Sequence, residues 1–424
     1  MLSAMSSKRI GPFLGLNNQA PATKMERGGD APGHWLRSAD NVDVTDAGTL
    51  RRRQGWVKRV GGTQMRGLFA LADGSALVAD YNQLFRLTYE DGQLSKQALM
   101  ADLRPGAPIS YTDTPMGTYL SDGYGLWVYR AGQVLRATMD VPNAPSVQAD
   151  VGGSLPGGLY QVACTFEQHD GTQSCASVVA QVAVPDKGLL RIGLPTSLQP
   201  LAAAVNVYVS PVDGDVLFLA EQLPMGTTQT TLYVPPMEGS RCFTLHMAPM
   251  PAGQIVRQHQ GRLLVARGAV VFTSQPYAYG IYDPAEDFMQ FPAEVTLLEP
   301  VRAGLFIVAD KTYFLPNEPG APMAEVLPYG APRGAAVQRG EGGGIYWMGD
   351  RGLVHATEDG QAKNMNDGVL ALPKPHSAAL LVREQDGMEQ IVAATQARPG
   401  ASLAQARSFM DAQVIKQGVL SDGI

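Results

Sequence analysis

Short apolar runs that turn back on themselves recur along the chain at a nearly constant interval. The runs begin at Leu77, Thr118, Leu263, Leu305, Ile345 and Ala379. The steps between them are roughly 41, 145, 42, 40 and 34 residues, and repeats of about 40 residues built from short strands are typical of β-propeller blades. The one long step returns to about 41 residues when a segment of roughly 104 residues is removed. The pattern therefore predicts a propeller interrupted by one insertion.

The inserted segment has the alternating pattern of a small β-sandwich. Tyr160, Val162, Cys164 and Phe166 fall on one face of a predicted strand, because successive side chains of a strand point to opposite faces. We predict seven strands, at residues 146–151, 158–168, 173–184, 189–194, 204–210, 216–223 and 229–234. Their number, and turn signals about every 10–15 residues, are typical of an immunoglobulin-like or fibronectin type III-like sandwich.

The N-terminal region predicts an extended arm and then a hairpin. Frequent Gly and Pro leave the arm little capacity for helix, and an alternating run at 41–44 returns at 50–60 after a turn. The predicted fold is all-β: a β-propeller with an inserted immunoglobulin/fibronectin type III-like sandwich and an extended N-terminal arm. The predicted parts are the arm and hairpin completing the propeller (1–62), the first blades (63–140), the sandwich (141–245), the remaining blades (246–396) and a C-terminal tail (397–424).

Composition narrows the function. Charged residues make up only 17% of the chain, so we expect protein–protein contact over much of its surface. The net charge of −6 argues against a protein held on nucleic acid by phosphate neutralisation. No apolar run reaches the 18 or so residues of a membrane span, and the first residues lack the apolar region of a secretory signal. We therefore expect folding in a cytosol and no membrane insertion by this chain.

The three cysteines fit a cytosolic compartment. Cys164 and Cys175 flank a turn at 169–172, and counting from that turn places them nearly opposite each other on paired strands. A cross-strand disulfide would fit this geometry, but in a reducing cytosol we favour two small buried hydrophobic side chains. Cys242 stands alone, and no Cys/His grouping has zinc spacing.

Arg51, Arg52 and Arg53 begin the one basic cluster of the chain. Three interpretations are open: a phosphate-contacting patch, a solvated strand face, or a surface that pairs with acidic residues of a neighbouring subunit. We favour the inter-subunit contact, because few aromatic residues interleave with the arginines.

The acidic residues within 40–46 and the glycine-rich run at 340–344 lack the patterns of known metal and phosphate sites. The aspartates at 40, 43 and 46 lack the alternate spacing and distal Glu of a calcium loop. Residues 340–344 lack the Gly-Lys-Ser/Thr ending of a phosphate loop. No nucleophile motif has supporting context, so we predict no catalytic, cofactor-binding or metal-binding residues, no cofactor and no enzymatic activity.

A second acidic group lies at 283–287 and has two interpretations. Asp283, Glu286 and Asp287 could form an acid pair for hydrolysis. We favour a loop in which Asp283 caps a turn before a proline while Tyr282 and Phe288 pack inward. The only candidate aromatic cluster for glycan binding is formed by Tyr277, Tyr279 and Tyr282.

Several short motifs resemble one group of bacteriophage virion proteins. At the N-terminus they are Gly15-Leu16-Asn17-Asn18, Ala39-Asp40-Asn41-Val42-Asp43-Val44 and Ala47-Gly48-Thr49-Leu50-Arg51-Arg52-Arg53-Gln54-Gly55-Trp56. Downstream they are Pro251–Val256, Gly261–Ala266, Ser274–Tyr277, Asp283–Phe288 and Trp347–Gly352. The resemblance extends over nearly all of the chain. With its predicted propeller, the chain looks most like the tail nozzle, or tail hub, of short-tailed phages.

The resemblance implies an assembly and a set of partners. Six copies would form a ring below the adaptor and portal, continue the DNA ejection channel and anchor other tail parts, including fibre or spike proteins. Double-stranded DNA would pass through without specific binding, which suits an acidic chain. The location would be the virion tail, assembled in the host bacterial cytoplasm, and candidate inter-subunit contacts are Arg51, Arg52, Arg53, Asn17 and Asn18. The alternatives are a tail-tip or baseplate protein of a longer-tailed phage, or a propeller that binds glycans or the host surface.

Overall fold

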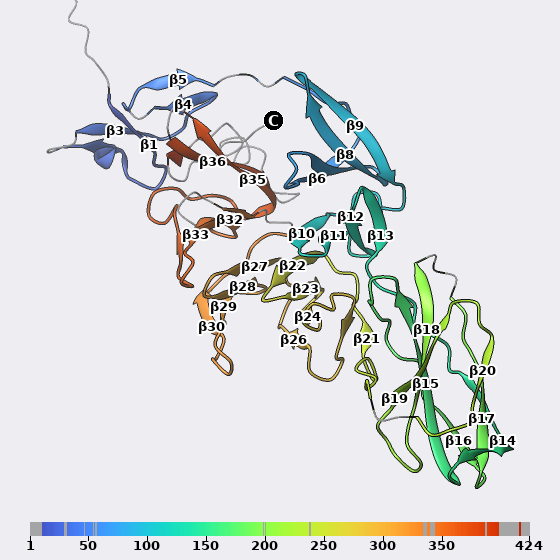
Figure 1. The fold of residues 1–424 in the computed structure, drawn as a ribbon. Helices are drawn as coiled ribbons and strands as arrows, with labels where there is room; N and C mark the ends of the chain where they lie inside the picture. The colour runs from blue at the N-terminus through green and yellow to red at the C-terminus, as the bar shows by residue number, and fades with distance from the viewer. Residues whose placement is uncertain are drawn as a thin grey trace, which may run out of the picture. The chain divides into compact units, whose positions relative to one another are not determined.

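The computed structural model describes residues 11–28, 32–45, 47–53, 55, 57–197, 199, 201–236, 239–333, 337–339, 344–385, 388–397 and 415–416. The described residues are almost entirely strands and turns, with one 3₁₀ turn, η1 (Ala22–Lys24). The chain forms two compact units, one from residues 62–290 and the other from residues 1–61 and 291–424 (Figure 1). The all-β prediction is therefore confirmed.

The unit of residues 62–290 contains three four-stranded antiparallel sheets, which we call blades 1, 2 and 3. Blade 1 consists of β6 (Met65–Ala70), β7 (Ala76–Asp80), β8 (Gln83–Glu90) and β9 (Gln93–Met100). Blade 2 consists of β10 (Ser110–Thr114), β11 (Gly117–Ser121), β12 (Leu126–Arg130) and β13 (Gln133–Arg136). Blade 3 consists of β22 (Ile255–His259), β23 (Arg262–Arg267), β24 (Val270–Thr273) and β26 (Phe288–Gln290), and a short pair, β21 (Ala248–Pro249) and β25 (Ile281–Tyr282), lies beside it in sequence.

Consecutive blades of this unit share their hydrophobic cores. Leu77 and Leu84 of blade 1 belong to the same buried cluster as Tyr111 and Leu120 of blade 2. A second cluster joins blades 2 and 3 in the same way, with Val128 of blade 2 among its members. Each blade therefore buries its apolar faces against its neighbours, as the blades of a propeller do. The architecture is propeller-like.

Between blades 2 and 3 the chain forms two further sheets packed face to face. One has the order β14 (Ser146–Leu155), β17 (Gly188–Gly193), β20 (Gln229–Leu232). The other has the order β16 (Ala180–Val184), β15 (Gly158–Gln168), β18 (Ala202–Val209), β19 (Phe218–Pro224). The predicted inward face of the second strand is confirmed, because Tyr160, Val162, Cys164 and Phe166 all lie in the buried core between the sheets.

The other unit contains blades 4 and 5. Blade 4 consists of β27 (Leu297–Val301), β28 (Gly304–Val308), β29 (Thr312–Pro316) and β30 (Ala324–Leu327). Blade 5 consists of β31 (Val337–Arg339), β32 (Ile345–Gly349), β33 (Gly352–Ala356) and β34 (Ala362–Asn364). Phe306 of blade 4 and Trp347 of blade 5 meet in the shared core, with ring centroids 5.7 Å apart.

The repeat predicted from the sequence is confirmed for five of its six positions. Leu77, Thr118, Leu263, Leu305 and Ile345 all lie in the second strand of a four-stranded sheet. Ala379 instead lies in a long hairpin of β35 (Pro375–Gln385) and β36 (Met388–Ala397), which with β37 (Ile415–Lys416) makes a three-stranded sheet. Ala379 lies in the first strand of its sheet rather than the second, which explains why the fifth step is shorter than the others.

The N-terminal strands belong to the same unit as blades 4 and 5. β1 (Phe13–Leu16) pairs in parallel with β3 (Gly33–Leu36), and β2 (Glu26–Arg27) lies on the other side of β3. The predicted hairpin is confirmed as β4 (Val42–Val44) and β5 (Leu50–Arg52), but its returning strand ends at Arg52 and does not extend to residue 60. Gly48 has a φ of 70° in its turn, and a Cβ there would lie 2.4 Å from Pro12, so this close approach requires glycine.

Candidate functional site

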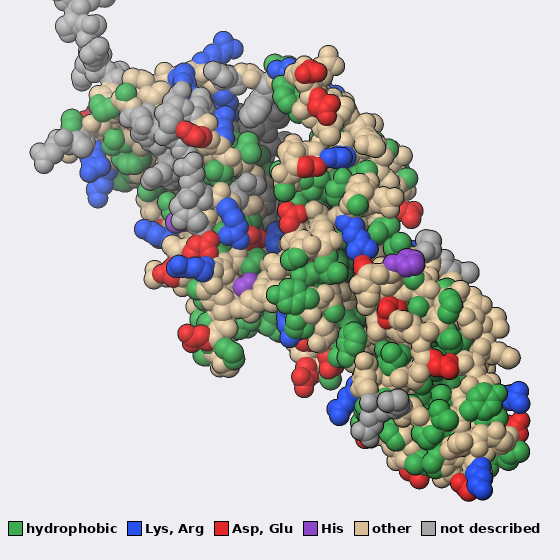
Figure 2. Space-filling model, viewed as in Figure 1, with side chains coloured by type: hydrophobic (Ala, Val, Ile, Leu, Met, Phe, Trp, Pro, Cys, Tyr) green, Lys and Arg blue, Asp and Glu red, His purple; other side chains and the backbone are tan. Residues whose placement is uncertain are grey.

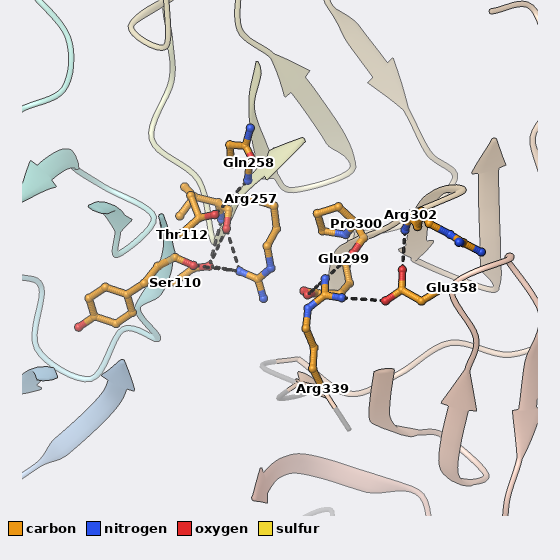
Figure 3. Close-up of polar contacts among 11 residues, drawn as sticks. Ser110, Thr112, Arg257, Gln258, Glu299, Pro300, Arg302, Arg339 and Glu358 are labelled. Atoms are coloured by element: carbon orange, nitrogen blue, oxygen red, sulfur yellow. Dashed lines mark hydrogen bonds and ion pairs between the residues drawn. The ribbon is translucent and has the colours of Figure 1, made fainter. Parts of the chain in front are cut away.

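Hydroxyl side chains of β10 hold the neighbouring strand β22, although the two strands are about 146 residues apart in sequence. Val256 N donates to Ser110 Oγ at 3.0 Å, and Gln258 N donates to Thr112 Oγ1 at 3.0 Å (Figure 3). Ser110 and Thr112 are two positions apart, so their side chains lie on one face of β10. The hydroxyls thus satisfy backbone N–H groups of the first strand of blade 3 from the first strand of blade 2.

Arg257 adds further hydrogen bonds to the contact between β10 and β22. Its Nη1 atom lies 2.9 Å from Ser110 Oγ and 2.8 Å from Val256 O, and Ser110 Oγ also donates to Val256 O at 3.3 Å (Figure 3). A guanidinium that bridges a hydroxyl and a carbonyl adds charge-assisted hydrogen bonds to the junction. The arrangement couples blades 2 and 3 through polar groups as well as through the core.

A second polar group occupies the corresponding first strands of blades 4 and 5. Arg339 of β31 donates to Pro300 O of β27 at 2.5 Å and pairs with Glu299 at 3.3 Å (Figure 3). Its other terminal nitrogen lies 3.2 Å from Glu358, whose second oxygen accepts the Arg302 N–H at 2.6 Å. Glu299 is only 10% exposed, so this pair is partly desolvated. The group links two blades with one arginine and two carboxylates.

Three of the motifs that carry the sequence resemblance converge on one loop of blade 3. Arg262 pairs with Asp287 at 3.2 Å and donates to Ser274 O at 3.0 Å. The other carboxylate oxygen of Asp287 accepts hydrogen bonds from Gln275 Nε2 and from Asp283 N. Both oxygens of Asp287 are therefore engaged in holding residues 274–287 against β23.

The loop interpretation of residues 283–287 is confirmed in its turn chemistry. Asp283 Oδ1 accepts the Ala285 N–H at 2.8 Å, and Asp283 O accepts the Asp287 N–H at 2.9 Å. Tyr282 packs edge-on against Phe272, as expected for an inward-facing ring. The prediction for Phe288 is wrong: its side chain is 44% exposed, because it stands in the edge strand β26 of the sheet.

Asn17 and Asn18, two of the candidate inter-subunit contacts, are engaged within their own unit. Asn18 Nδ2 donates to Ala371 O at 2.9 Å while its Oδ1 accepts the Ala371 N–H at 2.8 Å. Asn17 Oδ1 caps the following turn by accepting the N–H groups of Gln19 and Ala20. Leu16 packs on the core that blade 5 shares with β35 and β36. The described part of the arm is thus anchored by an amide pair and an apolar contact.

The three candidate arginines differ in their surroundings. Arg53 pairs with Asp43 across 3.5 Å, and both side chains are nearly buried, at 10% and 6% exposed. Arg51 is partly buried and has an interaction partner, whereas Arg52 is exposed on β5. Asp43 serves this hairpin pair, while Asp46, the third aspartate of the series considered for calcium, lies outside the described residues, as do residues 340–343 of the glycine-rich run.

The cysteines are three free, buried thiols, as favoured from the sequence. Burial raises the pKa of Cys164 to about 12 and that of Cys175 to about 12. Ser177, rather than Cys175, lies opposite Cys164, since Ser177 N donates to Cys164 O at 2.9 Å. Within the described ranges no cluster of His, Cys, Asp and Glu could hold a metal ion. That same part of the chain holds no helix long and apolar enough to span a membrane.

The tyrosines considered for glycan binding do not form one exposed cluster. Tyr277 is 68% exposed, but Tyr279 is 1% exposed and packs edge-on against Tyr119. Tyr282 is partly buried against Phe272.

Comparisons with known proteins leave the family open. No family model and no curated protein matches the chain. Among solved structures, the extracellular domain of a putative hybrid two-component system from B. thetaiotaomicron is 10% identical, covers 83% of this chain and 38% of its own, and has a TM-score of 0.33. The Neurospora crassa Pan2 WD40 domain is also 10% identical and covers 77% of this chain and 85% of its own, with a TM-score of 0.32. At these TM-scores neither likeness supports an argument about function.

Proposed function

We propose that this chain is a structural protein of a bacteriophage tail, a nozzle or hub. Six copies would form a ring that continues the DNA ejection channel below the portal and adaptor and anchors other tail parts. The net charge of −6 suits a channel wall along which DNA slides without being held. In Figure 2, basic and acidic side chains are interspersed over the face in view.

The observation that carries the proposal is the convergence of the resembling motifs on one loop. The motifs at 261–266, 274–277 and 283–288 are separate in sequence, yet Arg262 and Gln275 both contact Asp287 directly. Two N-terminal motifs are also in contact, because Asp43 of the first forms an ion pair with Arg53 of the second. A family that shares a scaffold would keep residues that hold it together, and we take these contacts as support for the resemblance.

We assign the inserted sandwich to the immunoglobulin-like class. With β14 taken as strand B, the adjacent pairs β14–β17, β15–β18 and β18–β19 follow the B–E, C–F and F–G neighbours of that fold, whereas β20, beside β17, has no counterpart in it. Large apolar side chains remain exposed on it: Val151, Val178, Tyr233, Val234 and Phe243, each more than half exposed. In the proposed ring, these side chains are candidates for contact with a neighbour or a fibre.

The ring is tested by mass photometry and electron microscopy of the purified full chain. We expect six copies around a central opening, and co-purification with the portal and adaptor when the three are expressed together. Co-purification with tail-tube proteins instead would identify a tail-tip or baseplate component. A monodisperse monomer that binds neither set would overturn the proposal.

Charge reversal separates assembly from folding. Arg52→Glu changes an exposed residue of the candidate inter-subunit set, so we expect a loss of rings with an unchanged melting temperature. Lys363→Glu is the matched control, because Lys363 is also exposed and its reversal changes the net charge equally. Equal loss of rings in both variants would show a general charge effect and remove Arg52 from the interface.

A further inference from the structure

A cavity of about 470 Å³ lies in the unit of residues 62–290. Four segments line it: the connection from blade 1 to blade 2 with Asp102 and Arg104, the turn and strand β12 with Tyr124 and Trp127, the end of β13 with Arg136, and the stretch before β22 with Met250 and Ala252. This volume falls within the range of small-molecule sites, roughly 300–1,000 Å³. We call this cavity the Arg104 pocket.

The backbone of the Arg104 pocket is fixed in advance of any ligand. Asp122 is 3% exposed, and its carboxylate accepts the N–H groups of Arg104, Tyr124 and Gly125 at 2.7–2.9 Å. Arg66 donates to Arg104 O at 2.7 Å from the other side. Both backbone groups of Arg104 are therefore held, and the buried carboxylate of Asp122 positions three lining residues.

Two arginine–aromatic pairs face the pocket. The Arg104 guanidinium lies 3.7 Å from the centroid of the Tyr124 ring, and Tyr124 remains 66% exposed. Arg136 is the direct cross-strand partner of Trp127, so the two side chains lie on the same face of blade 2. A Cβ at Gly125 would lie 2.1 Å from the Trp127 ring, so glycine is what lets the indole lie there. Among the ion pairs of the described residues, neither arginine takes part.

This combination selects a ligand chemistry. Guanidinium groups bind carboxylates in a bidentate manner, and aromatic rings receive the apolar face of a ring-shaped ligand. Asp102, exposed at the pocket, adds an acceptor for hydroxyl groups. We propose that the Arg104 pocket binds an acidic pyranose, such as a uronic acid residue of a polysaccharide, with its carboxylate on Arg104 and Arg136 and its ring against Tyr124 and Trp127. The inference is independent of the proposed ring.

The test is calorimetric titration of the full chain with trigalacturonic acid, a hyaluronan tetrasaccharide and sialyllactose. We expect at least one to bind, and its carboxylate methyl ester, the matched neutral ligand, to bind about tenfold more weakly or worse. Arg136→Gln and Tyr124→Ala should each weaken binding by about tenfold at unchanged melting temperature. Tyr89→Ala is the control, because Tyr89 is 67% exposed and lies outside the residues that line the pocket.

Three outcomes overturn the inference. They are no binding of any of the three saccharides at about 5 mM, equal binding of acid and ester, or equal loss with Tyr89→Ala and Tyr124→Ala. Deoxyadenosine monophosphate is titrated in parallel, because a phosphate and a flat base would use the same groups. If the nucleotide binds and the saccharides do not, the pocket is a nucleotide site and the proposal is wrong.

Discussion

The blades and the inserted sandwich bury their apolar residues in different ways. The sandwich has a core of its own, drawn from Met139 to Leu232 without a residue of any blade. The blades share theirs: one cluster combines Leu77 with Leu120, and another combines Phe306 with Trp347. Each blade of a propeller packs its two faces against the blades before and after it, so its core is shared with them. The two sheets of a sandwich pack against each other and enclose a core within one module.

The two kinds of core predict how far unfolding extends after a core side chain is removed. Removing a side chain from a shared core leaves a cavity against two blades, so both should open together. Removing one from the sandwich leaves a cavity within a single module, and local unfolding should stop at its boundaries.

The largest effect is expected from Phe306→Ala. Phe306 is fully buried and touches the rings of both Phe314 in its own blade and Trp347 in the next. Loss of a buried phenylalanine costs about 3–5 kcal/mol. Hydrogen exchange should accelerate in blades 4 and 5 together. Phe288→Ala, at an exposed phenylalanine, should change stability by less than about 0.5 kcal/mol. Acceleration limited to blade 4 would contradict the shared core.

Leu190→Ala should give a comparable but confined loss. Leu190 is fully buried in β17, within the sandwich core. Its truncation costs about 2–5 kcal/mol, and we expect faster exchange in residues 146–232 alone. Blade 1 peptides serve as the internal reference. Faster exchange there would show that the sandwich and the blades unfold as one unit.

Much of the fold could be predicted from the sequence because strand alternation and turn residues are local signals. The five equivalent second strands follow directly from those signals. The strand predicted to begin at residue 173 begins only at Ala180, for a physical reason. The Ser174 and Ser177 hydroxyls accept the N–H groups of Phe166 and Cys164, so side-chain oxygens replace backbone carbonyls in half of the ladder there. Serines that replace the ladder in this way leave the apolar–polar alternation of the sequence unchanged, so the sequence pattern placed the start of the strand too early.

The sites were much less predictable. The motifs around Arg262, Gln275 and Asp287 could be recognised one by one, but their convergence depends on the loop between β24 and β26. The Arg104 pocket gave no sequence signal, because Arg104 lies in the connection between blades 1 and 2, Arg136 lies in β13, and the two come beside Tyr124 and Trp127 only in the fold. Which residues face each other across two strands depends on the strand register, and the register cannot be read from the distance between those residues in the sequence.

Acidification should loosen blade 1 before the sandwich. Lys96 Nζ donates to Asp80 Oδ2, the N–H groups of Thr63 and Gln64 donate to its Oδ1, and these contacts lower the pKa of Asp80 below its usual value. Because the folded pKa is lowered, this contribution is present at neutral pH and is lost as the pH falls below about 4. We expect exchange in blade 1 to accelerate between about pH 4 and pH 2, and this pH-dependent part to vanish in Asp80→Asn. An identical pH profile in the variant would assign the loosening to other carboxylates.

The smallest effect concerns the contact between sandwich and blade. Arg130 of β12 pairs with Asp170, at the turn after β15, across 3.0 Å, and both side chains are about one third exposed. An ion pair open to solvent contributes about 0–1 kcal/mol and weakens with salt. A double-mutant cycle of Arg130→Ala and Asp170→Asn should give a coupling energy in that range that is lost at about 1 M salt. A coupling above about 2 kcal/mol would mean that the pair fixes the sandwich against blade 2. In that case the sandwich would have a hydrophobic core of its own and would still not move independently of blade 2.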